Sequence, residues 1–236
     1  MSEKIKIDTV AFEGLHRSGK GTQIEFLKEK LDEIGIPAIV VRGGGSRTNN
    51  GSDIGDPYSS WWEKHLSNLK KPDSKKSDWI EGSRRLSREM IVFRDRILPK
   101  FAEQKGASRA VLLIDRSILS HIAMLDDDDI LNMDKEHVYG VRSNQGKKLP
   151  DTANVFPDLL FYLKSSSDTL LKRLDENDPK YEFRKKNILE NGGKFDGAIS
   201  LLSDTLKDRI ITIDASLTPE DISDKIYNYY NNFKNE

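Results

Sequence analysis

The sequence of 236 residues contains no cysteine, and it also lacks long apolar runs. Without thiols the chain has no disulfide bonds, thiolate-rich zinc sites or cysteine nucleophiles. The longest apolar runs are short ones such as residues 110–114, and the charged first residues are followed by no apolar run of signal-peptide length. We therefore expect a soluble cytoplasmic protein that neither spans nor binds a membrane.

An excess of charge of one sign is missing as well, because 38 lysines and arginines are matched by 39 aspartates and glutamates. This balance argues against disorder caused by like-charge repulsion and against a nucleic acid as partner. With 36% hydrophobic residues the chain is long enough to bury a core, and it shows no internal repeat. We expect a single domain over residues 1–236.

Short apolar segments alternate with amphipathic segments along the whole chain. Buried strands are predicted at residues 5–12, 38–41, 110–114, 159–163 and 210–213. Alternation of this kind is typical of β-α-β crossovers and of a parallel sheet covered on both faces. The predicted fold class is α/β, a three-layer α/β/α arrangement around a five-stranded parallel sheet.

Three helices are placed by apolar spacing, breakers and capping residues. An amphipathic helix after the first strand is predicted by the apolar residues Ile24, Leu27, Leu31 and Ile34. It ends at Gly35. Residues 79–101 predict one long helix, with Pro99 as a candidate for a kink in its final turn. Thr218 and Pro219 predict the start of the last helix.

A glycine-rich motif lies between the first predicted strand and the first predicted helix. Gly14 is followed after four residues by Gly19 and Lys20, which is the spacing and the context of a phosphate-binding loop. Its glycines let successive N–H groups and the helix N-terminus face a polyphosphate, and Lys20 adds a positive charge near the β and γ phosphates. The alternative is a purely structural strand-to-helix turn.

The motif departs from the usual pattern at the position that binds magnesium. Gly21 stands where a Ser or Thr hydroxyl normally binds Mg²⁺, and Thr22 comes one place later. We therefore expect Mg²⁺ to be held mainly through water and a carboxylate. Asp115 is the candidate, because it ends a predicted strand and ligands of open α/β sheets gather at that edge. A helix N-cap is the structural alternative for Asp115.

Several segments, in this order and over nearly the whole chain, resemble thymidylate kinases. They are residues 12–15, residues 17–23, Arg42 with the glycines after it, residues 115–117 with Ser120, residues 157–159 and residues 213–216. The resemblance implies a P-loop kinase fold with a lid segment, and the activity of a nucleoside monophosphate kinase. Such an enzyme uses ATP and Mg²⁺ and transfers the γ-phosphoryl group to dTMP or a related pyrimidine monophosphate.

The resemblance also implies roles for individual residues. ATP binding is implied for Gly14, Leu15, His16, Arg17, Ser18, Gly19, Lys20, Gly21 and Thr22. Catalysis is implied for Arg17, Lys20 and Asp115, and acceptor binding for Arg42, Arg88, Arg116 and Ser120. A basic lid that closes over ATP is implied at about residues 173–195, with Lys180 and Arg184. Several converging cations are what phosphoryl transfer requires.

Departures from the family pattern lie on the acceptor side. His16 replaces an acidic residue that meets the acceptor's sugar, Arg84 replaces an aromatic residue that stacks on thymine, and Ser117 replaces a tyrosine. Polar matches and stacking supply discrimination between bases. We therefore predict weaker selection for dTMP than in a standard thymidylate kinase.

Two other functions stay open at this point. One is a deoxynucleoside kinase on the same fold, in which a free 5′-hydroxyl attacks and needs a carboxylate base. The other is a nucleotide-binding module without an acceptor site, although the sequence carries no Asn-Lys-x-Asp guanine reader after the third predicted strand. The base and sugar of the acceptor, the role of residues 124–155, and the oligomeric state, including a homodimer, also stay open.

Overall fold

The structure is a computed structural model that describes residues 5–42, 90, 92–123, 156–200, 202 and 204–235. Arg84, Arg88, the stretch 124–155 and most of the first half of the long helix predicted at 79–101 lie outside the described residues.

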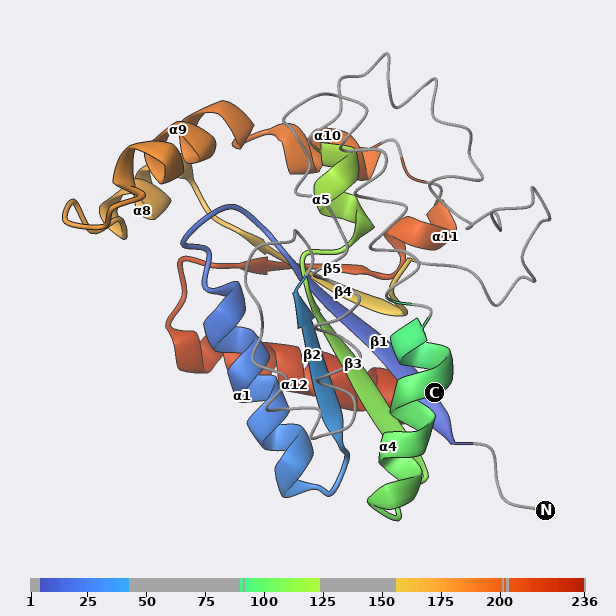
Figure 1. The fold of residues 1–236 in the computed structure, drawn as a ribbon. Helices are drawn as coiled ribbons and strands as arrows, with labels where there is room; N and C mark the ends of the chain where they lie inside the picture. The colour runs from blue at the N-terminus through green and yellow to red at the C-terminus, as the bar shows by residue number, and fades with distance from the viewer. Residues whose placement is uncertain are drawn as a thin grey trace, which may run out of the picture.

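Five parallel strands form one sheet, as predicted. They are β1 (Lys6–Glu13), β2 (Ala38–Arg42), β3 (Arg109–Asp115), β4 (Leu159–Lys164) and β5 (Ile210–Asp214). Their order across the sheet is β2-β3-β1-β4-β5, so β1 lies in the centre (Figure 1). The arrangement confirms the α/β fold class and is that of a P-loop kinase fold.

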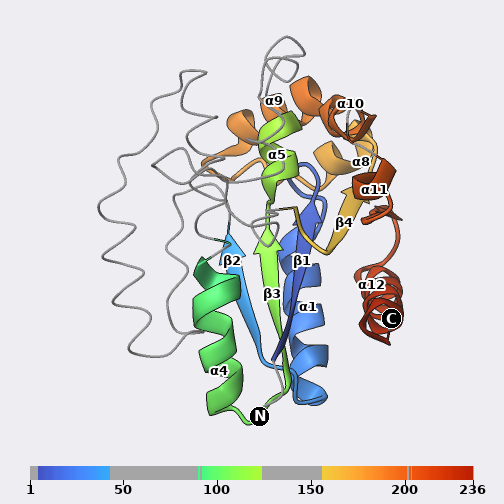
Figure 2. The same cartoon turned by 90° about the vertical axis from the view of Figure 1, so that its right-hand side faces the viewer.

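Helices cover both faces of the sheet (Figure 2). One face is covered by α1 (Lys20–Glu33) and α12 (Pro219–Asn235), which pack against each other. The other face carries the π-helical turn η2 (Phe93–Ile97), α4 (Leu98–Gln104), α5 (Ile118–Ala123), α8 (Ser167–Lys172), α9 (Tyr181–Asn191), α10 (Lys194–Ser200) and α11 (Asp204–Lys207). Among the described residues, no helix has both the length and the apolar character that crossing a membrane requires.

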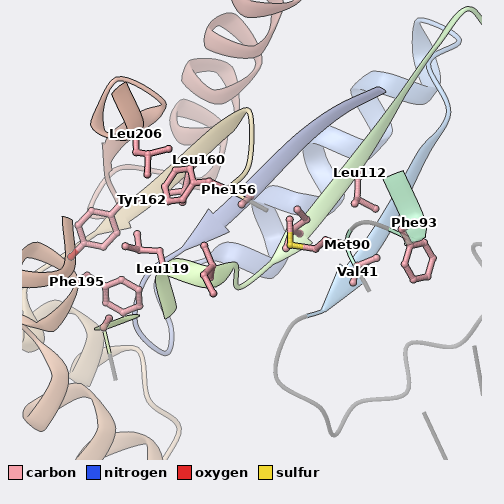
Figure 3. Close-up of a cluster of buried hydrophobic side chains, with 14 of the residues drawn as sticks. Val41, Met90, Phe93, Leu112, Leu119, Phe156, Leu160, Tyr162, Phe195 and Leu206 are labelled. Atoms are coloured by element: carbon pink, nitrogen blue, oxygen red, sulfur yellow. The ribbon is translucent and has the colours of Figure 1, made fainter. Parts of the chain in front are cut away.

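Alternate residues of the strands belong to the two faces of the sheet. Val10 pairs with Leu113 and both are buried under α1 and α12, whereas the next pair, Ala11 and Ile114, faces the other layer. Figure 3 shows that second cluster, in which Leu112 of β3 and Leu160 of β4 lie among side chains from several helices. Residues buried on both sides explain why these strands read as continuous apolar runs.

Two helix details differ from the sequence-based expectations. Ile34, one of the four apolar residues whose spacing predicts the first helix, lies outside it and is 43% exposed, because α1 ends at Glu33 and Gly35, at φ 71°, turns the chain away. Ahead of Pro99 the helix widens into the π-helical turn η2, where the N–H of Leu98 donates to the carbonyl of Phe93. Since Pro99 has no N–H and its ring crowds the preceding turn, the wider turn accommodates it.

Polar anchors fasten the sheet at the end away from the glycine-rich motif. The buried carboxylate of Asp8 accepts hydrogen bonds from Nε of Arg109 at 2.5 Å and from the hydroxyl of Tyr230 at 3.1 Å. One residue along β1, Thr9 donates its N–H at 2.8 Å and its hydroxyl at 2.7 Å to Asp158, at the entry to β4. These contacts give residue 158 a structural role and leave the opposite end of the sheet for ligands.

Candidate active site

The sheet topology brings the predicted phosphate-binding residues to one edge. In the register of the sheet Asp115 of β3 lies between Phe12 of β1 and Arg42 of β2, so these strands end side by side. The glycine-rich loop follows β1 directly and leads into α1 (Figure 1). The side chain of Arg42 lies outside the described residues, but its backbone position at this edge is the predicted one.

Gly14 begins the loop in a conformation that only glycine adopts readily. Its φ is 137°, and a Cβ atom there would lie 2.6 Å from the carbonyl oxygen of Leu163 and 2.8 Å from Oγ of Ser18. Gly19 has a φ of 92° and stands at the N-terminus of α1, which no side chain caps. The first N–H groups of α1 are thus left for a ligand, and helix N-termini favour anions.

Lys20 is held inside the loop that it completes. Its Nζ donates to the carbonyl oxygens of Gly14 and Leu15, each at 2.8 Å, and to Oγ of Ser18 at 3.3 Å. The pKa of Lys20 is lowered to about 7, mainly by burial and also by the charge of Arg116, while the charges of Asp115 and Glu13 oppose the shift. A polyphosphate in the loop would give the ammonium group of Lys20 an anionic partner and would favour its protonated form.

Glu13, which the sequence analysis did not single out, is the buried carboxylate of this edge. It is 0% exposed and accepts four hydrogen bonds: from the N–H and hydroxyl of Ser117 at 2.6 and 2.8 Å, and from the N–H and hydroxyl of Ser120 at 3.1 and 2.5 Å. Burial raises its pKa, and the hydrogen bonds and Arg116 oppose the rise. The one signal for it in the sequence is a charged residue that ends an apolar strand.

Arg116 occupies the tight turn between β3 and α5. Its φ is 73°, rare for a residue other than glycine, and its N–H donates to the carbonyl oxygen of Phe12 at 3.1 Å. Ser117 beside it caps α5, because its Oγ accepts the N–H of Leu119 at 3.2 Å. Ser117 thus takes the capping role that was the alternative for Asp115.

Arg17 and Arg184, predicted from the loop and from the lid, are brought together by a residue that the sequence analysis missed. Nη2 of Arg17 lies 3.1 Å from Oδ2 of Asp178, and Nη1 of Arg184 is paired with the same oxygen. The N–H of Lys180 donates to the other oxygen of Asp178 at 2.9 Å, and this bond is the largest cause of the lowered pKa of Asp178. The side chain of Lys180 itself is exposed.

His16 connects the same loop to α9 through a ring contact. Its imidazole meets the ring of Phe183 edge-on, with centroids 5.9 Å apart and an interplanar angle of 70°. Phe183 is nevertheless 63% exposed. An exposed aromatic ring beside the loop gives a planar ligand a surface on which to stack.

The residues expected at the metal site lie at the same edge. Asp115 is half-buried and its charge acts on Lys20, while Thr22 is exposed in the first turn of α1. The described residues contain no group of three or more His, Asp or Glu side chains that would hold a metal ion. Mg²⁺ bound to a nucleotide commonly uses one or two carboxylates with phosphate oxygens and water. The carboxylate of Asp115 fits that requirement.

Comparison with known proteins identifies distant relatives of this chain. No protein-family model matches the chain. Matching curated proteins include the thymidylate kinases of Leptospira interrogans serogroup Icterohaemorrhagiae serovar copenhageni (strain Fiocruz L1-130) and serovar Lai (strain 56601). Each is 29% identical over 168 residues, which are 70% of this chain and 68% of the relative. The chain is therefore distantly related to thymidylate kinases, which supports a nucleoside monophosphate kinase-like function.

Proposed function

We propose that the protein is an ATP-dependent nucleoside monophosphate kinase that phosphorylates dTMP or a related pyrimidine monophosphate. The observation that carries the proposal is the glycine-rich loop, which joins a buried lysine, Lys20, to an uncapped helix N-terminus. Arg17 belongs to this loop, and Arg116 is close enough for its charge to act on Lys20. Phosphoryl transfer depends on positioning and on neutralising charge, and such an arrangement provides both.

The transfer itself requires few groups on the protein. A phosphate oxygen of the acceptor attacks the γ-phosphorus of ATP, the bond from that phosphorus to the β–γ bridging oxygen breaks, and ADP leaves. Lys20 exchanges its carbonyl partners for the β and γ oxygens, and Arg17 faces the transferred group. Arg116 and Arg42, at the ends of neighbouring strands, hold the acceptor phosphate.

Magnesium would be held by Asp115, partly through water, with the hydroxyl of Thr22 nearby. When bound, it supplies charge neutralisation on the β and γ phosphates. With Gly21 in the loop, the protein contributes fewer oxygen ligands than the usual pattern does.

The state of Glu13 favours a phosphate acceptor over a free hydroxyl. A nucleoside kinase needs a carboxylate base to remove the proton of the attacking hydroxyl, whereas an ionised phosphate needs none. The fully buried Glu13 already accepts four hydrogen bonds from Ser117 and Ser120, so its oxygens are occupied. With Glu13 occupied and Asp115 assigned to Mg²⁺, this supports the monophosphate kinase rather than the deoxynucleoside kinase.

The test is a coupled assay of ADP release with dTMP, dUMP, dCMP, UMP and CMP and with the corresponding nucleosides. We expect turnover with dTMP and with at least one other pyrimidine monophosphate. Activity on a nucleoside and on no monophosphate would identify a deoxynucleoside kinase. ATP binding without turnover on any acceptor would identify a nucleotide-binding module.

A further inference from the structure

Asp178 lies in the turn between α8 and α9 and shares its carboxylate between two arginines from distant parts of the chain. Its Oδ2 accepts from Nη2 of Arg17, 3.1 Å away, and is paired with Nη1 of Arg184 as well. Arg17 belongs to the glycine-rich loop and Arg184 lies near the start of α9. A single oxygen atom thus joins the loop to α9.

The backbone of the turn fixes this carboxylate independently of the arginines. Oδ1 of Asp178 accepts the N–H of Lys180 at 2.9 Å, and the carbonyl oxygen of Asp178 accepts the N–H of Tyr181 at 2.7 Å. The direction of the Asp178 carboxylate is thus set by the turn that contains Asp178. An arginine that donates to this carboxylate is therefore positioned by Asp178. The side chain of Arg17 is 36% exposed, and Asp178 is the ion-pair partner that the structure gives it.

The charges explain why a carboxylate is needed between these two arginines. Two guanidinium groups that converge on one point repel each other, and one carboxylate between them removes that repulsion. The three side chains together keep a net charge of one positive unit, so a polyphosphate is still attracted. Without the carboxylate, Arg17 and Arg184 would separate.

Two further contacts hold α9 and the turn against the same loop. Arg173, the residue that follows α8, donates to the carbonyl oxygen of Ala215 at 2.8 Å and to that of Arg17 at 3.5 Å. On the other side, the rings of His16 and Phe183 meet. The pairing of Arg17 with Asp178 is therefore part of a contact made at several points.

We propose, on the basis of the function proposed above, that Asp178 is a positioning residue for phosphoryl transfer. It holds the guanidinium groups of Arg17 and Arg184 side by side at the mouth of the glycine-rich loop before ATP arrives. Both cations then face the γ-phosphate without having to be assembled by it, which raises the rate of the chemical step. Asp178 acts through the arginines and touches no substrate.

The test compares Asp178→Asn with Asp175→Asn as a matched control. Asp175 lies in the same turn, and its carboxylate accepts from the N–H of Asn177 at 3.0 Å and from the Asn177 side chain at 3.3 Å. Both variants remove one negative charge from the turn, but only the first removes the bridge. We expect kcat to fall about tenfold or more in Asp178→Asn, to stay within about twofold in Asp175→Asn, and to recover partly in Asp178→Glu.

A second readout does not depend on turnover. Hydrogen–deuterium exchange of α9 in the nucleotide-free protein is expected to accelerate in Asp178→Asn and to stay unchanged in Asp175→Asn. The proposal is overturned if Asp178→Asn keeps the wild-type kcat, or if it lowers the KM for ATP, since Asp178 would then be a competitor of the phosphates.

Failure of the proposed function would look different, because the wild-type protein itself would phosphorylate no monophosphate. In that case, the positioning role of Asp178 is tested by hydrogen–deuterium exchange in α9 and by the affinity for a non-hydrolysable ATP analogue. Unchanged exchange together with unchanged or tighter binding in Asp178→Asn would overturn the positioning role as well.

Discussion

The hydroxyl group of Ser120 donates a hydrogen bond to Oε2 of Glu13 across 2.5 Å, so a fully buried carboxylate fastens the first turn of α5 to the end of β1. Ser117 donates to the other oxygen of Glu13 through its N–H and its hydroxyl. Arg116, at φ 73°, lies directly before Ser117. The backbone that presents Arg116 to the site is therefore held by Glu13.

Replacing Glu13 by alanine should destabilise the protein strongly. It would leave the N–H of Ser117 and the hydroxyls of Ser117 and Ser120 buried without this acceptor, and each such loss costs about 1–3 kcal/mol. The N–H of Ser120 would keep the carbonyl oxygen of Ser117, 3.2 Å away. We expect the free energy of unfolding in urea to fall by about 3 kcal/mol or more. Glu13→Gln keeps one oxygen acceptor and should lose clearly less. Equal stability of Glu13→Ala and wild type would show that these bonds do not hold the turn.

Replacing Gly21 by serine should ease the requirement for magnesium. The position is open, since a Cβ atom there would meet nothing within 4 Å, and serine restores the hydroxyl that the usual loop pattern has. We expect the Mg²⁺ concentration for half-maximal activity to fall several-fold. Gly21→Ala is the matched control and should leave it unchanged. A similar effect of both variants would mean that the hydroxyl does not reach the metal.

Removing Arg109 should destabilise the fold without acting on the site. Arg109→Met would leave the buried carboxylate of Asp8 without its ion-pair partner, which costs about 3–5 kcal/mol. Tyr230→Phe removes only one hydrogen bond to Asp8 and should cost about 1 kcal/mol. Lys30→Ala, at an exposed pair with Glu33, should change the free energy of unfolding by less than about 0.5 kcal/mol. These losses are measured by unfolding in urea. A smaller loss for Arg109→Met than for Tyr230→Phe or Lys30→Ala would contradict the structural role of the Arg109–Asp8 ion pair.

The lowered pKa of Lys20 should appear in the pH dependence of stability. Because burial lowers this pKa from 10.5 to about 7, the unfolded chain binds more protons at this group between these values. By linkage, stability from Lys20 is present above pH 10.5 and is lost as the pH falls towards about 7. The free energy of unfolding of wild type minus that of Lys20→Met should therefore rise from pH 7 towards pH 10. If the free energies of unfolding of the two proteins changed with pH in parallel, the pKa of Lys20 would not be lowered in the folded protein.

The sheet and the loop could be predicted from the sequence, because each depends on residues close together in the chain. Apolar runs mark strands buried on both faces, and the spacing of Gly14, Gly19 and Lys20 marks a strand-to-helix turn of the kind that phosphate-binding loops have. Local spacing also has limits. It counts Ile34 with the apolar residues of the first helix, although Ile34 follows the end of α1 and is exposed.

The remaining parts of the site depend on pairs that are far apart in sequence. Glu13 meets Ser120, 107 residues away, and Arg17 meets Asp178, 161 residues away. No local pattern marks Asp178 as different from the other acidic residues of its polar segment. The role proposed for it rests on the packing of α9 against the loop.

The most direct test of the account follows the γ-phosphoryl group itself. The protein is incubated with γ-labelled ATP, Mg²⁺ and dTMP or another pyrimidine monophosphate, and the products are separated by chromatography. We expect the label to appear on the nucleoside diphosphate made from the acceptor, and we expect Lys20→Ala to abolish this transfer while its far-UV circular dichroism stays that of the wild type. Label that never reaches a monophosphate, or transfer by Lys20→Ala within a few-fold of wild type, would contradict the account.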